Sequence, residues 1–358
     1  MDEAAILSLL HELVEIESPT GDPGVRAVAE RMAAELRALG ADVTFLDDHL
    51  RAELAGEGDP ILLLGHTDTV WELGTLDRMP FRIEEGLAYG PGVYDMKGGL
   101  TIIVAALRRA SERRRAVRVF LTADEEQGSR TAKPLLEEAA SGVAGALVLE
   151  PALSGGGLKT ARKGLARFWL EVSGRAAHSG TSAREGASAI EELAHQVIRL
   201  HALNDEERGI SLNVGVIEGG TWANVVAAKA RAEIDVRVTH AADVPRVEFA
   251  LSELQPSVPG TTLGLTGGWT RPPLERSDGA ARLFARARDH GRELGLDLEE
   301  GSSGGGSDGN LVGALGVPVL DGLGAVGGGA HALDEHVEVA SLTQRTELLA
   351  RLLCDPDL

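Results

Sequence analysis

The sequence has one cysteine, a deficit of positive charge and no long apolar run. Cys354 is the only cysteine among 358 residues, so no disulfide can form within the chain. Lys and Arg number 35 against 55 Asp and Glu, and this net charge of −20 disfavours nucleic acid or an anionic membrane surface as the main partner. No stretch approaches the ~18 apolar residues that a membrane-spanning helix needs. An anionic small molecule remains compatible, because a local arginine cluster can outweigh the net field.

The first residues show no secretory signal. Met1–Ala5 has neither the basic stretch nor the apolar stretch of a secretory signal, and we therefore expect a cytoplasmic protein. The apolar fraction of 43% is enough to bury a full core, and the length suggests one large domain or two ordinary ones.

Apolar periodicity predicts alternating helices and strands in the first part of the chain. Because strands alternate with helices, we expect a parallel α/β sheet with helices on both faces. The basic cluster at residues 108–115 is interpreted as a solvated helix end. The predicted helices cover residues 2–16, 24–39, 99–113 and 131–140, and the predicted strands cover 42–46, 50–54, 60–65, 117–123 and 146–149.

The pattern changes after about residue 160 and returns at about residue 277. Strand, helix, two strands, helix and strand follow one another at residues 165–173, 184–203, 210–218, 224–238, 243–254 and 262–266. This β-α-β-β-α-β order is typical of a ferredoxin-like unit. We predict an α/β catalytic domain made of residues 1–160 and 271–358, with an inserted ferredoxin-like domain at 161–270.

The first chemical motif ends the apolar run Ile61–Leu64, which reads as a strand buried on both faces. His66 and Asp68 lie two residues apart, so in extended chain both side chains leave from the same face. The Asp68 carboxylate can then accept a hydrogen bond from one ring nitrogen of His66 and leave the other nitrogen for a metal. Asp95 follows Gly90-Pro91-Gly92, on a loop between a strand and a helix start, where a carboxylate is well placed to ligate a cation.

Acidic residues follow two further predicted strands. Glu125 and Glu126 come after the strand at 117–123, and because they are adjacent, one can face a metal and the other a bound water. Glu150 comes directly after the strand at 146–149. Ligand sites in open parallel sheets lie beyond the carboxyl ends of the strands. An ordinary acidic loop would explain one such residue. Potential ligands after the carboxyl ends of three separate strands favour a metal site.

His331, in the segment Gly327–His336, supplies a second imidazole. Two imidazoles, two terminal carboxylates and a bridging aspartate make a dinuclear nitrogen and oxygen site suited to Zn²⁺, with Co²⁺ or Mn²⁺ as substitutes. Such a pair of cations polarises a carbonyl, and a nearby glutamate outside the ligand set takes the proton of the attacking water.

These motifs resemble those of the aminoacylase and carboxypeptidase G-type dinuclear zinc exopeptidases, in order and approximate spacing over the whole chain. The resemblance is greatest to the glutamate carboxypeptidase branch. It implies a three-layer zinc-exopeptidase catalytic domain with an inserted dimerisation, or lid, domain. The matching segments are His66–Val70, Gly90–Gly99, Asp124–Glu126, Glu150-Pro151 and Gly329–His331, with support from Met79–Arg82, Gly304–Asn310 and Pro318–Gly324.

The resemblance also implies a role for each residue of the site. His66 and Glu150 would hold one zinc, Glu126 and His331 the other, and Asp95 would bridge them. Asp68 would orient His66, and Glu125 would be the general acid and base. A cis peptide is implied after Asp95.

Residues of the inserted domain complete the expected site. On its own, His178 reads as a loop histidine, but the resemblance implies that it reaches the active site of a neighbouring subunit and stabilises the oxyanion, and hence that the protein is a homodimer through this domain. Asn224 and Arg237 match positions that bind the carboxylate of the substrate, although a salt bridge at a strand edge would also explain Arg237. Arg271 and Lys159 are weaker candidates for a second substrate carboxylate.

The glycine-rich segment at residues 302–309 has three interpretations. A flexible linker is one, and a phosphate cradle is another, although the Lys-Ser/Thr that should follow is missing. We favour a loop whose backbone, at Gly305, approaches the substrate.

Together these features predict a dinuclear zinc exopeptidase that releases a C-terminal amino acid with a free carboxylate, with glutamate favoured. The substrate would be a small peptide or N-acyl amino acid, with neither nucleic acid nor membrane as a partner. An N-acyl amino acid deacylase of the deacetylase or desuccinylase type, or a dipeptidase, would use the same mechanism. A non-catalytic carboxylate-binding dimer is the alternative from another class.

Overall fold

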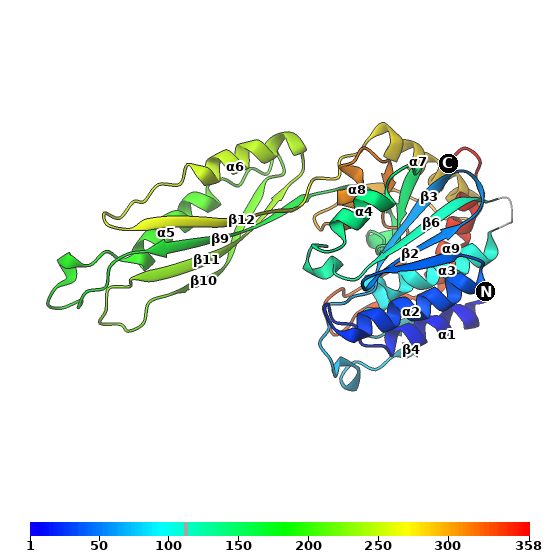
Figure 1. The fold of residues 1–358 in the computed structure, drawn as a ribbon, viewed down its shortest axis with the longest axis horizontal. Helices are drawn as coiled ribbons and strands as arrows, with labels where there is room; N and C mark the ends of the chain where they lie inside the picture. Colours follow the sequence, from blue (N-terminus) through cyan, green and yellow to red (C-terminus); the bar gives the residue numbers. More distant parts are fainter. Residues whose placement is uncertain (111–113) are drawn as a thin grey trace. The chain divides into compact units, whose positions relative to one another are not determined.

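The computed structural model describes residues 1–110 and 114–358, and the chain divides into two compact units (Figure 1). Unit 1 comprises Met1–Arg162, Arg276–Ser303 and Ser307–Leu358. Unit 2 comprises Lys163–Glu275 together with Gly304–Gly306. Unit 2 begins and ends within a few residues of the predicted insertion at 161–270, and it also takes in three glycines that the sequence prediction gives to the catalytic domain.

Unit 1 is built around a six-stranded sheet in the order β1-β2-β6-β3-β7-β14. Strands β6, β3, β7 and β14 run parallel, whereas β1 and β2 form an antiparallel hairpin that pairs with β6. The predicted parallel sheet is wrong for these two strands, because the Asp47-Asp48 connection is too short for the crossover that a parallel pair needs. The strands are β1 (Asp42–Leu46), β2 (His49–Leu54), β3 (Glu57–His66), β6 (Arg115–Thr122), β7 (Gly145–Val148) and β14 (Val319–Leu320).

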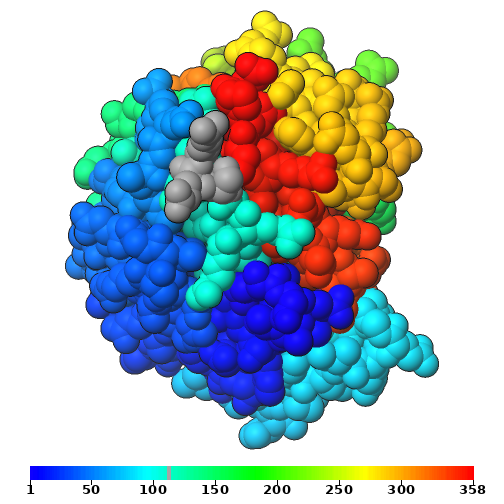
Figure 2. All heavy atoms as spheres, turned by 90° about the vertical axis from the view of Figure 1, so that its right-hand side faces the viewer, coloured from blue at the N-terminus to red at the C-terminus, as the bar shows by residue number. Residues whose placement is uncertain are grey.

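Helices cover the strands of unit 1 in two groups. The first group is α1 (Glu3–Val14), α2 (Pro23–Ala38), α3 (Gly98–Arg109) and α9 (Val339–Leu353), and α7 (Asp278–Glu293) contacts α9 and β14. The second group is α4 (Lys133–Ala139) and α8 (Asp308–Gly313), which contact each other. The first and last helices lie side by side, blue and red in Figure 2. Residues 111–113, at the end of the predicted helix 99–113 and inside the predicted basic cluster, lie outside the described residues.

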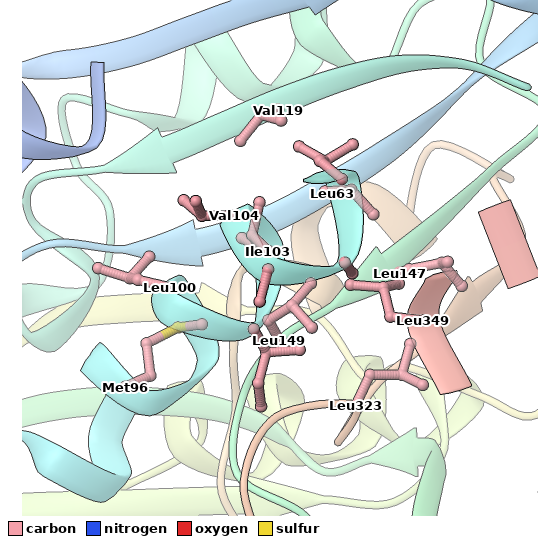
Figure 3. Close-up of a cluster of buried hydrophobic side chains, with 14 of the residues drawn as sticks. Leu63, Met96, Leu100, Ile103, Val104, Val119, Leu147, Leu149, Leu323 and Leu349 are labelled. Carbon is pink, nitrogen blue, oxygen red and sulfur yellow. The ribbon is translucent and has the colours of Figure 1, made fainter. Parts of the chain in front are cut away.

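The central strands are buried on both faces, as the apolar run in β3 predicts. Ile61 and Leu63 belong to the main core, and Leu62 and Leu64, whose side chains point to the opposite face, are also buried. Figure 3 shows Leu63 among core side chains from β6, β7, α3 and α9. This rigid centre fixes the position of the loops that follow the strands.

We expect Leu63→Ala to lower the free energy of unfolding by about 2–5 kcal/mol, because it removes buried methyl groups and leaves a cavity. Leu315→Ala is the matched control, since Leu315 is 49% exposed, and its effect should stay within about 0.5 kcal/mol. Urea denaturation followed by circular dichroism measures both. Equal effects at the two positions would contradict the packing described for Leu63.

Unit 2 is a ferredoxin-like fold, as predicted. Its four strands are antiparallel in the order β10-β11-β9-β12, and the two helices pack on one face of the sheet through a separate apolar core. Buried residues alternate with more exposed ones along β9, as expected for a strand with one covered face. The elements are β9 (Gly164–Ser173), α5 (Ala189–His201), β10 (Ser211–Gly219), β11 (Lys229–Val238), α6 (Val244–Ser252) and β12 (Thr262–Arg271).

Two small sheets complete unit 1. One has the order β15-β16-β5-β4, with β15 (Gly327–Gly328), β16 (His336–Glu338), β5 (Leu87–Tyr89) and β4 (Arg82–Glu84). The other pairs β8 (Leu158–Arg162) with β13 (Glu300–Ser303) in parallel. Through the first sheet, segments more than two hundred residues apart become neighbours. Across the described part of the chain, no helix combines the length and the apolar character needed to cross a membrane.

Candidate metal centre

Three predicted site segments follow neighbouring parallel strands. His66 is the last residue of β3, Glu125 and Glu126 lie in a turn of 3₁₀-helix after β6, and Glu150 lies two residues beyond β7. Because β3 lies between β6 and β7, the three segments leave the sheet at adjacent positions on the same edge. The order of strands in the sheet thus brings together side chains that are 24 to 84 residues apart in sequence.

Asp95 reaches this edge from the irregular segment Val93–Lys97, which leads into α3. Gly92 has a φ of 71°, and a Cβ atom there would lie 2.6 Å from Cγ2 of Thr69, so the loop packs against the chain that follows His66. Likewise, a Cβ atom on Gly99 would lie 2.0 Å from the carbonyl oxygen of Leu149. The peptide after Asp95 is cis, as the resemblance implies.

His331 lies on the loop between β15 and β16 and has a φ of 63°. Strand β16 pairs with β5, with His336 opposite Tyr89. Since β5 ends just before the Gly90–Asp95 loop, this pairing sets the loop that carries His331 beside the loop that carries Asp95.

The side chains of these loops converge around the carboxylate of Asp95. Nε2 of His66 lies 3.2 Å from Oδ1 of Asp95 and 3.6 Å from Oε1 of Glu150. Nε2 of His331 lies 3.3 Å from Oδ2 of Asp95 and 3.6 Å from Oε1 of Glu126. The structure therefore contains two groups of one imidazole and one glutamate, and each group faces a different oxygen of the same aspartate.

The spacing and chemistry of these atoms fit metal ions. Ligand atoms about 2.0–2.2 Å from a tetrahedral zinc lie roughly 3.3–3.6 Å from one another, and the distances above fall close to this range. One ligand atom each from His66, Asp95 and Glu126 lie within 4.8 Å of one another. Oε1 of Glu126 is buried and has no hydrogen-bond partner within the described residues, as expected for an atom that binds a cation.

Asp68 makes contacts that the sequence did not predict. Nδ1 of His66 lies 2.9 Å from the backbone carbonyl oxygen of Asp68 and 3.4 Å from its carboxylate, so the carbonyl is the closer partner of the ring. The carboxylate accepts hydrogen bonds from the backbone N–H groups of Glu125 and Glu126 at 3.2 and 3.1 Å, and from the hydroxyl of Thr20 at 2.7 Å. Asp68 thus links the His66 loop to the Glu125–Glu126 turn.

Burial and charge shift the titration of the cluster. Burial lowers the pKa of His66, but the carboxylates of Asp68 and Asp95 outweigh it and raise the pKa well above its usual value. The neighbouring carboxylates of Asp95 and Glu126 raise the pKa of His331 to about 10. Burial, together with the charge of Asp95, raises the pKa of Glu126 and of Glu150. Without metal, His331 therefore carries a proton at neutral pH.

We expect metal binding to the metal-free protein at pH 7 to release protons and to strengthen as pH rises, because a ligating imidazole must be neutral. For His331 we expect this pH dependence between pH 6.5, the ordinary pKa of a histidine, and about pH 10. The charged ring stabilises the metal-free fold fully below pH 6.5, and this contribution is lost as pH rises through 10.

Calorimetry with Co²⁺ in buffers of different ionisation enthalpy measures the protons released. His331→Asn should reduce their number, whereas replacing the exposed His201 with alanine should not. Metal binding without proton release would contradict the charge state described for the cluster.

Two buried side chains near the centre were not predicted from the sequence. Arg162 makes paired hydrogen bonds with Asp321 at 2.7 and 2.8 Å, and its Nη2 lies 3.6 Å from Oε2 of Glu150. After burial and the charge of Asp95, the negative charge of Glu125 also contributes to the raised pKa of Glu150. Glu335 is fully buried beneath the Asp95 loop. Neither Arg162 nor Glu335 belongs to a spacing pattern, and only burial distinguishes them from surface charges.

The remaining predicted residues belong to unit 2, except Lys159, which is buried in β8 of unit 1. His178 is exposed, and its Nδ1 accepts hydrogen bonds from the N–H groups of Gly180 and Thr181, so in the neutral ring Nε2 carries the proton. Asn224 is exposed on the connection between β10 and β11.

Arg237 has partners within unit 2. Its guanidinium pairs with Asp235 at 2.8 Å, which is the strand salt bridge given as the alternative, and it also donates to the carbonyl oxygen of Gly304 at 2.7 Å. Arg271 is buried at the end of β12, and Gly305 lies on the loop beside Gly304. The substrate contacts predicted for these residues remain predictions.

Comparisons with known proteins agree on the family. The model of "Peptidase family M20/M25/M40" matches residues 62–355. Carboxypeptidase G2 of Pseudomonas sp. (strain RS-16) is 30% identical over 373 residues, which cover 99% of this chain and 90% of that protein. A succinyl-diaminopimelate desuccinylase of Xanthomonas oryzae is 30% identical over 380 residues, covering 97% and 98%. The crystal structure of a tripeptidase from Staphylococcus aureus is similar in fold, with a TM-score of 0.84, 23% identity and coverage of 99% and 98%.

Proposed function

Since this chain belongs to peptidase family M20/M25/M40 and is a hydrolase of peptide or other amide bonds, we propose that it is a dinuclear metal-dependent exopeptidase that releases a C-terminal amino acid, preferably glutamate. The observation that carries the proposal is the shared carboxylate of Asp95, whose two oxygens face two separate imidazole–glutamate groups. The preference for glutamate rests on the resemblance of the sequence motifs to the glutamate carboxypeptidase branch, and the similarity to carboxypeptidase G2 over 99% of the chain supports a carboxypeptidase.

The ligand roles follow from the two groups. His66 and Glu150 would hold one cation and His331 and Glu126 the other, with an oxygen of Asp95 available to each. Zn²⁺ suits these nitrogen and oxygen ligands, with Co²⁺ or Mn²⁺ as substitutes. When bound, the two cations polarise the scissile carbonyl and favour ionisation of the attacking water.

Glu125 has the role of proton carrier. It takes a proton from the water that attacks the carbonyl carbon and gives it to the nitrogen of the leaving amino acid as the amide bond breaks. Asp68 supports this role, because its carboxylate holds the backbone N–H of Glu125. The Nε2–H of His178 is a suitable donor for the developing oxyanion in the active site of a neighbouring subunit, since its Nδ1 is occupied by backbone donors.

Recognition of a free carboxylate is assigned to unit 2. Arg237 offers a planar guanidinium that can hold a carboxylate in a bidentate manner, and Asn224 offers an amide donor. Arg271 and the backbone at Gly305 are further contact candidates. For Arg237, binding the substrate requires its guanidinium to exchange or share its present partners Asp235 and Gly304.

A second candidate is hydrolysis of an N-succinyl or other N-acyl amino acid. The similarity to succinyl-diaminopimelate desuccinylase, at 30% identity over nearly the full length, favours it. The proton transfers would be the same, and only the group on the acyl side of the bond would differ. A few pocket contacts decide such a preference.

The test pairs metal analysis with a panel of substrates. Purified protein is loaded with Zn²⁺ or Co²⁺, its metal content is measured, and hydrolysis is followed on dipeptides and on N-acetyl, N-benzoyl and N-succinyl amino acids ending in Glu, Asp, Ala or Arg. Two metals per chain with the highest kcat/KM for C-terminal glutamate would support the proposal. A preference for the acyl group would favour the second candidate, and a metal-loaded protein without turnover on the panel would leave a carboxylate-binding protein.

The protein is further proposed to be a homodimer through unit 2. Strand β10 is an edge strand, and apolar side chains on it and on the adjacent helix α5 are exposed: Val216 by 44%, Ile217 by 57% and Ile198 by 70%. We expect Ile217→Glu to give monomers in light scattering and to lower activity. Phe249→Glu is the matched control, since Phe249 is 67% exposed on α6. A monomeric wild-type protein would refute the dimer.

Cell fractionation tests the predicted cytoplasmic location.

A further inference from the structure

The carboxylate of Glu335 lies beneath the loop that carries Asp95. Its Oε1 accepts hydrogen bonds from the backbone N–H groups of Tyr94 and Asp95 at 2.9 and 3.0 Å. Its Oε2 accepts one from the N–H of Gly92 at 3.0 Å and one from Nε1 of Trp71 at 2.7 Å. Glu335 is fully buried, so these four donors replace water around its charge.

These hydrogen bonds provide partners for backbone N–H groups in an irregular segment. The segment Gly92–Asp95 is irregular, and the N–H groups of Gly92, Tyr94 and Asp95 donate to Glu335 in place of the backbone carbonyls of a helix or strand. A carboxylate satisfies several donors at once, and hydrogen bonds to an ionised group are stronger than neutral ones. The buried side chain of Lys97, whose charge interacts with Glu335, lies two residues after Asp95.

Glu335 also connects three segments that carry predicted ligands. Trp71 follows the His66 loop, Asp95 lies on the second segment, and Glu335 itself stands four residues after His331. One carboxylate therefore ties together the loops of His66, Asp95 and His331. Within the described residues, the hydrogen bonds between Glu335 and the Asp95 segment all come from backbone N–H groups, so Glu335 acts on the proposed ligands through the backbone.

We propose that Glu335 is a positioning residue that holds Asp95 and His331 at the spacing needed to bind two cations. This inference rests on the proposed function, because it assumes that Asp95 is the shared ligand. Glutamine at this position has the same shape, but its NH₂ group would face two of the four donors. The Asp95 loop would then have to shift or lose hydrogen bonds.

The test compares Glu335→Gln with Glu192→Gln as the matched control. Glu192 is also fully buried, and its Oε2 accepts hydrogen bonds from the N–H groups of Ser257 and Val258 at 2.7 and 2.6 Å, but all of these residues belong to unit 2. Both variants and the wild type are titrated with Co²⁺, and affinity, stoichiometry and the visible absorption of bound Co²⁺ are recorded. Circular dichroism checks the fold of each.

We expect Glu335→Gln to weaken Co²⁺ binding by about 10–100-fold, the usual loss when a partner of a ligand is replaced, and to change the absorption spectrum. Glu192→Gln should bind Co²⁺ as the wild type does, whatever its stability. Wild-type affinity and spectrum in a folded Glu335→Gln protein would overturn the proposal. If that variant does not fold, Glu335→Asp is measured instead, because aspartate keeps the charge but reaches fewer of the donors. An intermediate Co²⁺ affinity would support the proposal, and an unchanged Co²⁺ affinity would overturn it. A wild type that binds no Co²⁺ would instead refute the proposed function.

Discussion

Glu125→Gln is expected to lower kcat by about 10²–10⁴-fold, the usual contribution of a general acid and base, while the metal content stays at the wild-type level. The amide has nearly the same shape as the carboxylate but cannot take the proton of water. Glu125 stands on the turn after β6, where the Asp68 carboxylate accepts a hydrogen bond from its backbone N–H at 3.2 Å, and its charge contributes to the raised pKa of the proposed ligand Glu150. Both the position and the charge of Glu125 therefore suit proton transfer beside the metal pair.

Two further variants make this result specific. Glu126→Gln, at the adjacent proposed ligand, is expected to lower metal content as well as kcat. Glu137→Gln, at an exposed position on α4, is expected to leave both unchanged. Steady-state kinetics and metal analysis on the same samples separate the three cases. Full activity in Glu125→Gln would assign the proton transfer to another group.

Asp95→Asn is expected to have the second large effect, a loss of metal to one ion or fewer per chain together with a fall in kcat/KM of about 10³-fold or more. A bound cation supplies several kcal/mol of transition-state stabilisation, and each 1.4 kcal/mol is about tenfold in rate. Asparagine offers one oxygen where the two imidazole–glutamate groups require two, and its NH₂ would face one of the imidazoles.

The control for this variant is Asp297→Asn, at an exposed aspartate. It should keep both metals and full activity. Metal analysis after dialysis, followed by addition of Zn²⁺ or Co²⁺, shows whether lost activity returns with metal. Two tightly held metals in Asp95→Asn would mean that Asp95 does not bridge the cations.

The sequence predicted the local structure around the site because each signal was contained in a short window. The apolar run in β3 and its polar end at His66 were visible as a strand followed by ligands, and the structure has β3 end at His66. The β-α-β-β-α-β pattern of unit 2 was also readable, since each strand and helix carries its own periodicity. The antiparallel β1–β2 hairpin was missed because the direction of pairing depends on a two-residue turn.

Other features depended on contacts between distant segments. Asp68 was expected to orient His66, and its carboxylate lies 3.4 Å from Nδ1 of that ring. The hydrogen bonds of the same carboxylate to the Glu125–Glu126 turn were not predicted, because no local pattern encodes the approach of that turn. Glu335 looks like any acidic residue in a loop until the Asp95 segment covers it. Gly304–Gly306 follow unit 1 in the chain but belong to unit 2.

By itself, the sequence determined which residue types stand at the strand ends, the alternation that makes the α/β fold and the family motifs, because these depend on residue identity and short-range periodicity. Only the tertiary structure decided that β6, β3 and β7 are neighbours, that the His331 loop lies beside the Asp95 loop through β16 and β5, and that Glu335 joins them. The physical reason is that burial and hydrogen bonding between segments up to about 270 residues apart arise only when the whole sheet is assembled.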